Sequence, residues 1–185
     1  MDWSIAAEAI WFIFPAYLAN SSAVVVGGGP PIDFGKKWNG KRILGNGKTW
    51  RGFFGGIIIG TAGGLIMNIV IPETFGKGIS SLIVLFSISF GALSGDLLES
   101  FFKRRLGRKR GEKWLLADQI DFLLGAFFFS FLVSMLLENT GMTDKNWFLS
   151  SFSAWHILFL LIFTPVLHYI VNLIGYPLGL KKVPW

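Results

Sequence analysis

Residues 79–98 read ISSLIVLFSISFGALSGDLL, twenty consecutive positions with a single charged side chain, Asp96. A helix of about 20 mainly apolar residues spans the hydrocarbon core of a bilayer, so this stretch predicts a transmembrane helix. Four other apolar stretches of similar length lie at about residues 4–26, 52–71, 120–137 and 153–174. We therefore expect an all-α integral membrane protein, a bundle of about five transmembrane helices that forms one domain over residues 1–185.

The composition of the whole chain agrees with this fold class. Hydrophobic residues make up 52% of the 185 positions, only 15% are charged, and the mean hydropathy is +0.57. A soluble domain of this length needs more polar surface, and a nucleic-acid-binding protein usually carries more charge. The chain has no cysteine, which excludes disulfides and thiolate metal sites. Because the first apolar run follows Asp2 and contains Glu8 instead of a basic start, we expect a retained helix.

The positions of lysine and arginine predict the orientation of the bundle. Of the 17 basic residues, 15 lie in residues 27–51, in residues 99–119 and in the tail after the last helix. Only Lys77 and Lys145 occupy the other two connections. Cytoplasmic loops carry the excess of positive charge, so we expect two long cytoplasmic loops, a cytoplasmic C-terminus and an N-terminus outside. Five spans satisfy the odd number that this arrangement requires.

Glycines repeat every four residues along the second predicted helix, at Gly52, Gly56, Gly60 and Gly64. Such spacing leaves one helix face without side chains, which allows a neighbouring helix to approach closely. We interpret this face as a packing seam; a ligand groove along it is the alternative.

Four carboxylates surround the second basic segment. Asp96 and Glu99 close the third predicted helix, and Asp118 and Asp121 open the fourth, each pair three residues apart and so on one helix face. If the two helices are neighbours, the carboxylates converge at one depth, where Mg²⁺ binds through carboxylates together with substrate phosphates. In the alternative, Glu99 pairs with Lys103 and the aspartates only cap the fourth helix.

The first basic loop ends in Gly47-Lys48-Thr49, followed by Arg51, before the second helix begins. It is not a Walker A loop, because Arg42 stands where that motif needs its first glycine. Flexible glycines, backbone N–H groups at a helix start and two cations nevertheless suit phosphate oxygens. A solvated loop that only sets the topology is the alternative. Elsewhere, His156 and His168 are too far apart for a helical metal pair, and we expect both to be structural.

Several of these segments resemble one enzyme family. The run Gly95-Asp96-Leu97-Leu98-Glu99-Ser100, the pair Lys103-Arg104 and the run Asp118-Gln119-Ile120-Asp121 resemble the membrane CTP-transferase (phosphatidate cytidylyltransferase) superfamily. The first loop resembles the archaeal branch, the CDP-archaeol synthases. That likeness is carried by Ala19-Asn20, Gly29-Pro30-Pro31-Ile32-Asp33-Phe34, Lys41-Arg42-Ile43-Leu44-Gly45 and Gly47-Lys48-Thr49-Trp50-Arg51-Gly52.

The resemblance implies a multi-pass enzyme of the cell membrane, with its active site on the cytoplasmic side and no nucleic-acid partner. It implies Mg²⁺-dependent transfer of CMP from CTP to 2,3-bis-O-(geranylgeranyl)-sn-glycerol 1-phosphate, with release of pyrophosphate, and it is compatible with a homo-oligomer. The implied metal ligands are Asp96, Glu99, Asp118 and Asp121, and the implied triphosphate-binding residues are Gly47, Lys48, Thr49 and Arg51. Lys103 and Arg104 would neutralise the lipid phosphate or the pyrophosphate. Asn20 and Asp33 would contact the nucleotide or order the first loop. The alternatives are a related enzyme with another lipid phosphate, a small cation transporter, and a scaffold that binds anionic lipids.

Overall fold

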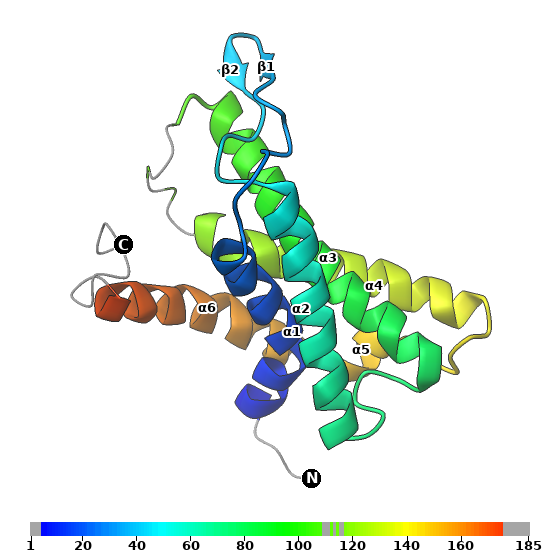
Figure 1. The fold of residues 1–185 in the computed structure, drawn as a ribbon. Coiled ribbons are helices and arrows are strands. Elements are labelled where there is room, and N and C mark those ends of the chain that lie inside the picture. The colour runs from blue at the N-terminus through cyan, green and yellow to red at the C-terminus, as the bar shows by residue number, and fades with distance from the viewer. Residues whose placement is uncertain (1–4, 109–111, 113, 115–116, 176–185) are drawn as a thin grey trace.

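The structure, a computed structural model, describes residues 5–108, 112, 114 and 117–175. Four helices are long and apolar enough to cross a membrane: α1 (Ile5–Val25), α2 (Trp50–Val70), α3 (Gly78–Arg105) and α4 (Ala117–Asn139). A fifth apolar helix, α6 (Ala154–Gly175), follows the short helix α5 (Trp147–Ser151). Figure 1 shows α1, α2 and α3 packed together, with α4 crossing behind α3 and α6 leaving the bundle on the other side. The expected all-α membrane fold is confirmed, whereas the orientation of the bundle in the membrane stays a prediction.

Helix α3 is longer than the sequence predicted, because it continues past residue 98 to Arg105. Its end is a Schellman motif: Gly107 has a φ of 81°, its N–H donates to the Arg104 carbonyl, and the Arg108 N–H donates to the Lys103 carbonyl. Glu99, Lys103 and Arg104 therefore lie on the last turns of a helix and not in a loop. The expectation of a long loop over residues 99–119 was wrong to this extent.

The first connection contains an antiparallel hairpin, β1 (Lys37–Trp38) with β2 (Lys41–Arg42), where the sequence predicted an irregular loop. Asn39 and Gly40 both have positive φ, 50° and 74°, as a two-residue Asn-Gly turn requires. Figure 1 shows the hairpin at the tip of α3. The other predicted cytoplasmic cations Lys109, Arg110, Lys113, Lys181 and Lys182 lie outside the described residues.

The glycine repeat of α2 is a packing seam, as predicted. A Cβ atom placed on Gly52, Gly56 or Gly60 would lie within 3.0 Å of a backbone carbonyl oxygen of α1. Those carbonyls belong to Ala23, Ala19 and Pro15, in this order. The two backbones are thus in direct contact, which fixes the end of α1 beside the start of α2.

A second close crossing joins α3 to α4, and the sequence analysis did not identify it. A Cβ on Gly95 would lie within 3.0 Å of the Asp121 carbonyl oxygen, and one on Gly125 within 3.0 Å of the Gly91 carbonyl oxygen. Asp96 directly follows one of these glycines, and Asp121 precedes another by one helical turn. The crossing therefore brings the acidic ends of α3 and α4 together.

A polar cluster of three residues lies at the opposite end of the bundle, where α1 and α6 begin. His156 Nε2 is 3.1 Å from Glu8 Oε2, and His156 Nδ1 is 2.6 Å from Ser153 Oγ and accepts the Ser153 N–H at 3.1 Å. The rings of Phe12 and Phe152 pack against the buried imidazole. The predicted structural role of His156 agrees with this: it joins α6 to α1.

Candidate active site

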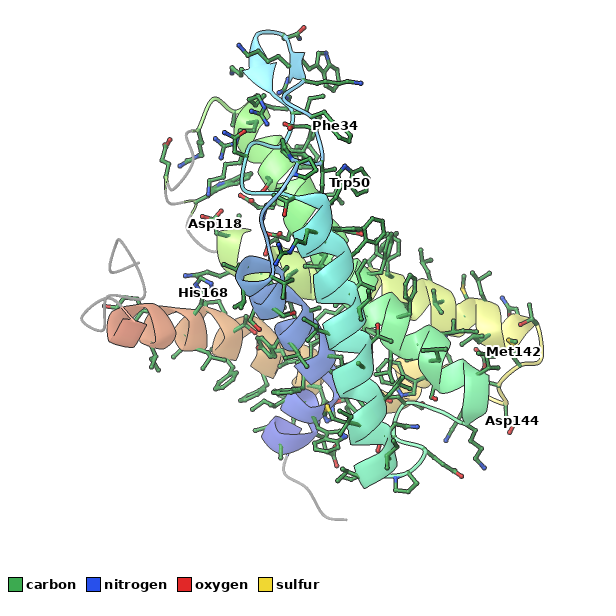
Figure 2. All side chains as sticks on the ribbon, viewed as in Figure 1. Phe34, Trp50, Asp118, Met142, Asp144 and His168 are labelled. Carbon is green, nitrogen blue, oxygen red and sulfur yellow. The ribbon has the colours of Figure 1, made fainter. Side chains whose placement is uncertain are left out.

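A cavity of about 580 Å³ opens where the ends of α1 and α3 meet the starts of α2 and α4 and the first loop. Ten of the twelve predicted site residues line it: Asn20, Gly47, Lys48, Thr49, Asp96, Glu99, Lys103, Arg104, Asp118 and Asp121. Asp33 and Arg51 do not. Figure 2 places Asp118 and Asp144 at opposite ends of the molecule, so the cavity belongs to one end of the bundle.

Lys48 connects the first loop to α3 across the cavity. Its Nζ lies 2.6 Å from Oδ1 and 2.5 Å from Oδ2 of Asp96. Both side chains keep about a quarter of their surface exposed, 25% for Lys48 and 23% for Asp96. The pair therefore faces the cavity and stays accessible to a ligand.

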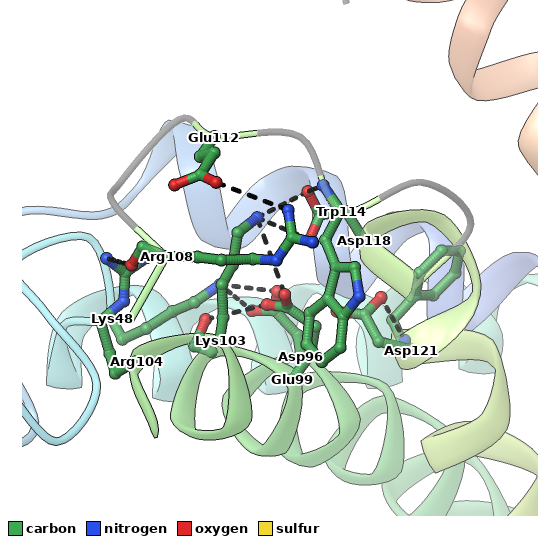
Figure 3. A network of polar contacts seen from close by, with 12 residues as sticks. Lys48, Asp96, Glu99, Lys103, Arg104, Arg108, Glu112, Trp114, Asp118 and Asp121 are labelled. Carbon is green, nitrogen blue, oxygen red and sulfur yellow. Dashed lines mark hydrogen bonds and ion pairs between the residues drawn. The ribbon is translucent and has the colours of Figure 1, made fainter. Parts of the chain in front are cut away.

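Lys103 joins α3 to α4 at a deeper position. Its Nζ donates to both carboxylate oxygens of Asp118, at 2.7 and 2.6 Å, and lies 3.7 Å from Glu99 Oε1. Figure 3 shows the ammonium group between the two carboxylates. The alternative pairing of Glu99 with Lys103 is therefore present, but within a larger network. The backbone N–H of Trp114 also donates to Asp118, at 3.2 Å.

Two buried atoms of this network have no hydrogen-bond partner in the described part of the chain. These are Oε1 of Glu99, whose side chain is only 8% exposed, and Nε of Arg104. Arg104 uses Nη1 to donate to the Arg108 carbonyl at 2.8 Å. A ligand in the cavity could use both atoms. Unused capacity does not by itself mark a site, because Thr61 Oγ1, Ser89 Oγ and Ser134 Oγ elsewhere in the bundle also have no hydrogen bond among the described residues.

Asp121 lies in the first turns of α4, and its Oδ1 accepts the Phe122 N–H at 2.6 Å. Asn20 reaches the same cavity from the last turns of α1. The structure thus brings together residues that the sequence separates by about a hundred positions.

Thr49 has a structural task in addition to lining the cavity. Its hydroxyl caps α2 by accepting the Gly52 N–H, and it also accepts the N–H of Gly28, both at 3.2 Å. An N-cap satisfies a free donor of the first helical turn and fixes where the helix begins. Thr49 therefore holds the segment after α1 against the start of α2, and its hydroxyl oxygen is already used.

Asp33 orders the first loop, one of its two predicted roles. This buried carboxylate accepts hydrogen bonds from the Arg42 guanidinium and from the backbone N–H groups of Gly35, Leu44 and Gly45. Burial alone would raise the pKa of Asp33, but the hydrogen bonds from Arg42 and the backbone outweigh it and hold the pKa well below its usual range. The carboxylate thereby anchors the strip from Leu44 onward, which forms one wall of the cavity.

Arg51 is exposed on the first turn of α2 and is not among the residues that line the cavity, so its triphosphate contact stays a prediction. A different arginine, Arg105, binds the hairpin, and the sequence did not indicate this role. Its guanidinium donates to the carbonyls of Trp38, Lys41 and Arg42 at 2.5, 3.1 and 2.6 Å. Only its place in the basic run pointed to it.

The acidic residues do not form a ready metal cage. Among the residues described, no group of three or more His, Cys, Asp or Glu side chains is arranged to hold a metal ion. Asp96 and Asp118 are instead paired with lysines. The donor set still fits a hard cation, because all four carboxylates line one cavity and Glu99 Oε1 accepts no hydrogen bond from the residues that the structure describes.

Comparison with known proteins identifies the family. A family model described as CarS-like, CDP-archaeol synthase, matches residues 3–185. The CDP-archaeol synthase of Pyrococcus horikoshii is 48% identical over 96% of this chain and 96% of its own length. This chain belongs to the CDP-archaeol synthase family. The CDP-archaeol synthase of Methanosarcina acetivorans is 46% identical over 94% of this chain and its whole length.

A solved structure supports the same assignment. It is described as an intramembrane enzyme for archaeal membrane lipids biosynthesis, with 32% identity, a TM-score of 0.73, and coverage of 91% of this chain and 94% of its own. CDP-archaeol synthases are CTP-dependent cytidylyltransferases that act on a lipid phosphate, and the chain is an enzyme of this class, embedded in the membrane by several apolar helices. The family favours this activity over the transporter and scaffold alternatives.

Proposed function

We propose that the cavity binds CTP with Mg²⁺ and transfers CMP to 2,3-bis-O-(geranylgeranyl)-sn-glycerol 1-phosphate on the cytoplasmic side of the cell membrane. One observation carries this proposal: a single cavity at the end of an apolar bundle is lined by four carboxylates and by three cations, Lys48, Lys103 and Arg104. The described basic residues of the first loop lie at this end, whereas Lys77 and Lys145 lie in the α2–α3 and α4–α5 connections, which supports a cytoplasmic site.

The reaction needs positioning more than a protein nucleophile. An oxygen of the lipid phosphate attacks the α-phosphorus of CTP and forms a new P–O bond. The bond from that phosphorus to the bridging oxygen breaks, and pyrophosphate leaves with the electron pair. Alignment of the two anions and neutralisation of their charge supply the rate enhancement.

The residues of the cavity suit these tasks. Lys48 directly follows Gly45, Asn46 and Gly47, which also line the cavity. A triphosphate would bind there against backbone N–H groups. Lys103 and Arg104 lie on the last turns of α3, where they neutralise the lipid phosphate or the leaving pyrophosphate. Asp96, Glu99, Asp118 and Asp121 would hold Mg²⁺, which neutralises and orients phosphate oxygens when bound.

Replacement of single carboxylates tests the proposal. We expect Asp118→Asn and Asp121→Asn each to lower CMP transfer by at least about a thousandfold, because a neutral amide binds a divalent cation poorly. Transfer is measured with labelled CTP and the lipid phosphate in detergent. Asp144→Asn, an exposed aspartate at the opposite end, is the matched control and should retain full activity. Full activity of either cavity variant would remove that residue from the metal ligands.

The lipid specificity is tested with the same assay. Phosphatidic acid offers the same phosphate chemistry on ester-linked acyl chains, and we expect it to be a poor acceptor beside the geranylgeranyl ether lipid phosphate. Equal rates with the two lipids would replace the proposed acceptor with a broader class of lipid phosphates.

A further inference from the structure

We propose that Lys48 and Lys103 are internal counter-cations that hold the acidic residues of the cavity until substrate arrives, so that a divalent cation and a nucleotide triphosphate bind only together. The proposal rests on the proposed function of this cavity and adds the order in which its ligands bind. It concerns the exchange of ion-pair partners and includes no covalent step.

The two ion pairs have the same design. Each ammonium group contacts both oxygens of one aspartate at 2.5–2.7 Å, Lys48 with Asp96 and Lys103 with Asp118. Each pair also bridges two elements of the cavity wall, the first loop with α3 and α3 with α4. Two of the four carboxylates offered to a metal ion are thus already occupied by cations of the chain.

The depth of the Lys103 pair makes its disruption costly. Lys103 is 7% exposed, and Glu99, at 3.7 Å from it, has a side chain that is 8% exposed. Asp118 keeps 32% of its side chain exposed, so Lys103 is the buried partner, and loss of Asp118 would leave the buried ammonium charge uncompensated. A free divalent cation would take Asp118 from Lys103 and leave the ammonium group next to the new dication.

The nucleotide alone meets the opposite difficulty. A triphosphate that draws Lys48 and Lys103 to its oxygens would leave Asp96 and Asp118 as bare carboxylates facing the phosphates. When both ligands enter together, the carboxylates turn to the metal ion and the ammonium groups turn to the phosphates. Every charge then has a partner, so each ligand raises the affinity for the other, a coupling that is reciprocal by thermodynamic necessity.

The unused atoms of the network support this exchange. Oε1 of Glu99 has no hydrogen bond among the described residues and lies 3.7 Å from Lys103 Nζ in the cavity wall. It can accept a metal ion once the ammonium group moves away. Lysine suits such a movement because its charge is carried on four flexible methylene groups, whereas a forked guanidinium would be harder to release.

Binding experiments on the full-length protein in detergent test the exchange. Mn²⁺ replaces Mg²⁺, and its binding is measured by electron paramagnetic resonance without and with CTP. The binding of labelled CTP is measured first with EDTA and then with Mn²⁺. We expect the wild type to bind Mn²⁺ at least tenfold more weakly without CTP than with it. We expect it to bind CTP at least tenfold more weakly with EDTA than with Mn²⁺ present. Lys103→Met and Lys48→Met should each bind Mn²⁺ alone at least tenfold more tightly than the wild type, and CTP more weakly.

Lys145→Met, an exposed lysine at the opposite end, is the control and should behave as the wild type. Should Lys103→Met fold poorly, added Mn²⁺ should raise its Tm more than that of the wild type, because the metal ion replaces the missing cation. Wild-type affinity for Mn²⁺ alone that equals that of both variants would overturn the exchange and leave the proposed function intact. Absence of any Mn²⁺-dependent CTP binding would overturn the proposed function and the exchange with it.

Discussion

The two ends of the bundle each hold a cluster of charged and polar side chains, and the clusters differ in how their hydrogen bonds are satisfied. Both nitrogens of His156 have partners, Glu8 and Ser153, and aromatic rings cover the imidazole. At the cavity end, Glu99 Oε1 and Arg104 Nε are buried without a hydrogen bond among the described residues. None of the three residues of the His156 cluster lines the cavity.

The difference separates a structural polar cluster from a binding site in an apolar bundle. A polar pair inside a membrane protein joins two helices when each group is satisfied, and it then needs no ligand. A cluster with four carboxylates, one unused acceptor, one unused donor and an adjoining cavity has room and charge for a ligand. The comparison predicts that changes at the cavity end lower activity, whereas changes in the His156 cluster lower stability alone.

Among the changes that test this comparison, the largest effect is expected for Gly95→Ala, at the crossing that brings the acidic ends of α3 and α4 together. The added methyl group would lie within 3.0 Å of the Asp121 backbone, so the helices must separate. Misplacement of reacting groups by about 1 Å can cost a hundredfold in rate, and we expect a loss of this order in CMP transfer. The labelled-CTP assay measures it, and a thermal melt reports the accompanying loss of stability.

The matched control for this change is Gly63→Ala on α2. There the new Cβ meets only the Leu18 side chain, which can move, and the site is remote from the cavity wall. We expect activity within about twofold of the wild type. An active Gly95→Ala variant would show that the α3–α4 crossing does not position the carboxylates.

A smaller effect, on stability alone, is expected for Glu8→Ala at the opposite end. The change leaves Nε2 of the buried His156 without its partner, and an unsatisfied buried group costs about 1–3 kcal/mol. We expect a lower Tm and an unchanged kcat for the folded protein. Glu138→Ala, an exposed glutamate at the end of α4, is the control for the loss of charge. A fall in kcat for Glu8→Ala would show that this cluster communicates with the cavity.

The sequence predicted the parts of the molecule that depend on regular patterns. The five apolar helices follow from the length of apolar runs, and the α1–α2 contact follows from the glycine repeat. Ten predicted site residues share one cavity. Charged residues near the ends of apolar helices avoid the lipid and gather where water or another charged group is available. The family resemblance supplied the chemistry that the residue types alone left open.

The remaining features depend on contacts that a single sequence does not display. The close crossing of α3 and α4 depends on Gly91 and Gly95 in one helix and Gly125 in the other. The glycines of either helix alone do not indicate which helix they contact. The pairing of Lys48 with Asp96 joins residues 48 positions apart. The hairpin has a local signature in Asn39-Gly40, but the basic loop around it lacks the alternating apolar pattern that would indicate two strands.

The smallest effect concerns Asp33, which anchors the loop wall without touching the cavity. Because its pKa in the folded protein is below the value of 3.8 expected for the unfolded chain, its contribution to loop order is fully present above about pH 4. It is lost only as the pH falls through the depressed pKa.

The chain has no cysteine, so a spin label on Lys36→Cys reports loop mobility specifically. We expect constant mobility from pH 6 to pH 4 and higher mobility at every pH in Asp33→Asn, with a modest rise in KM for CTP. The exposed Asp144→Asn should change neither, and a label that loosens near pH 4 would mean that Asp33 titrates as an ordinary carboxylate and does not hold the wall.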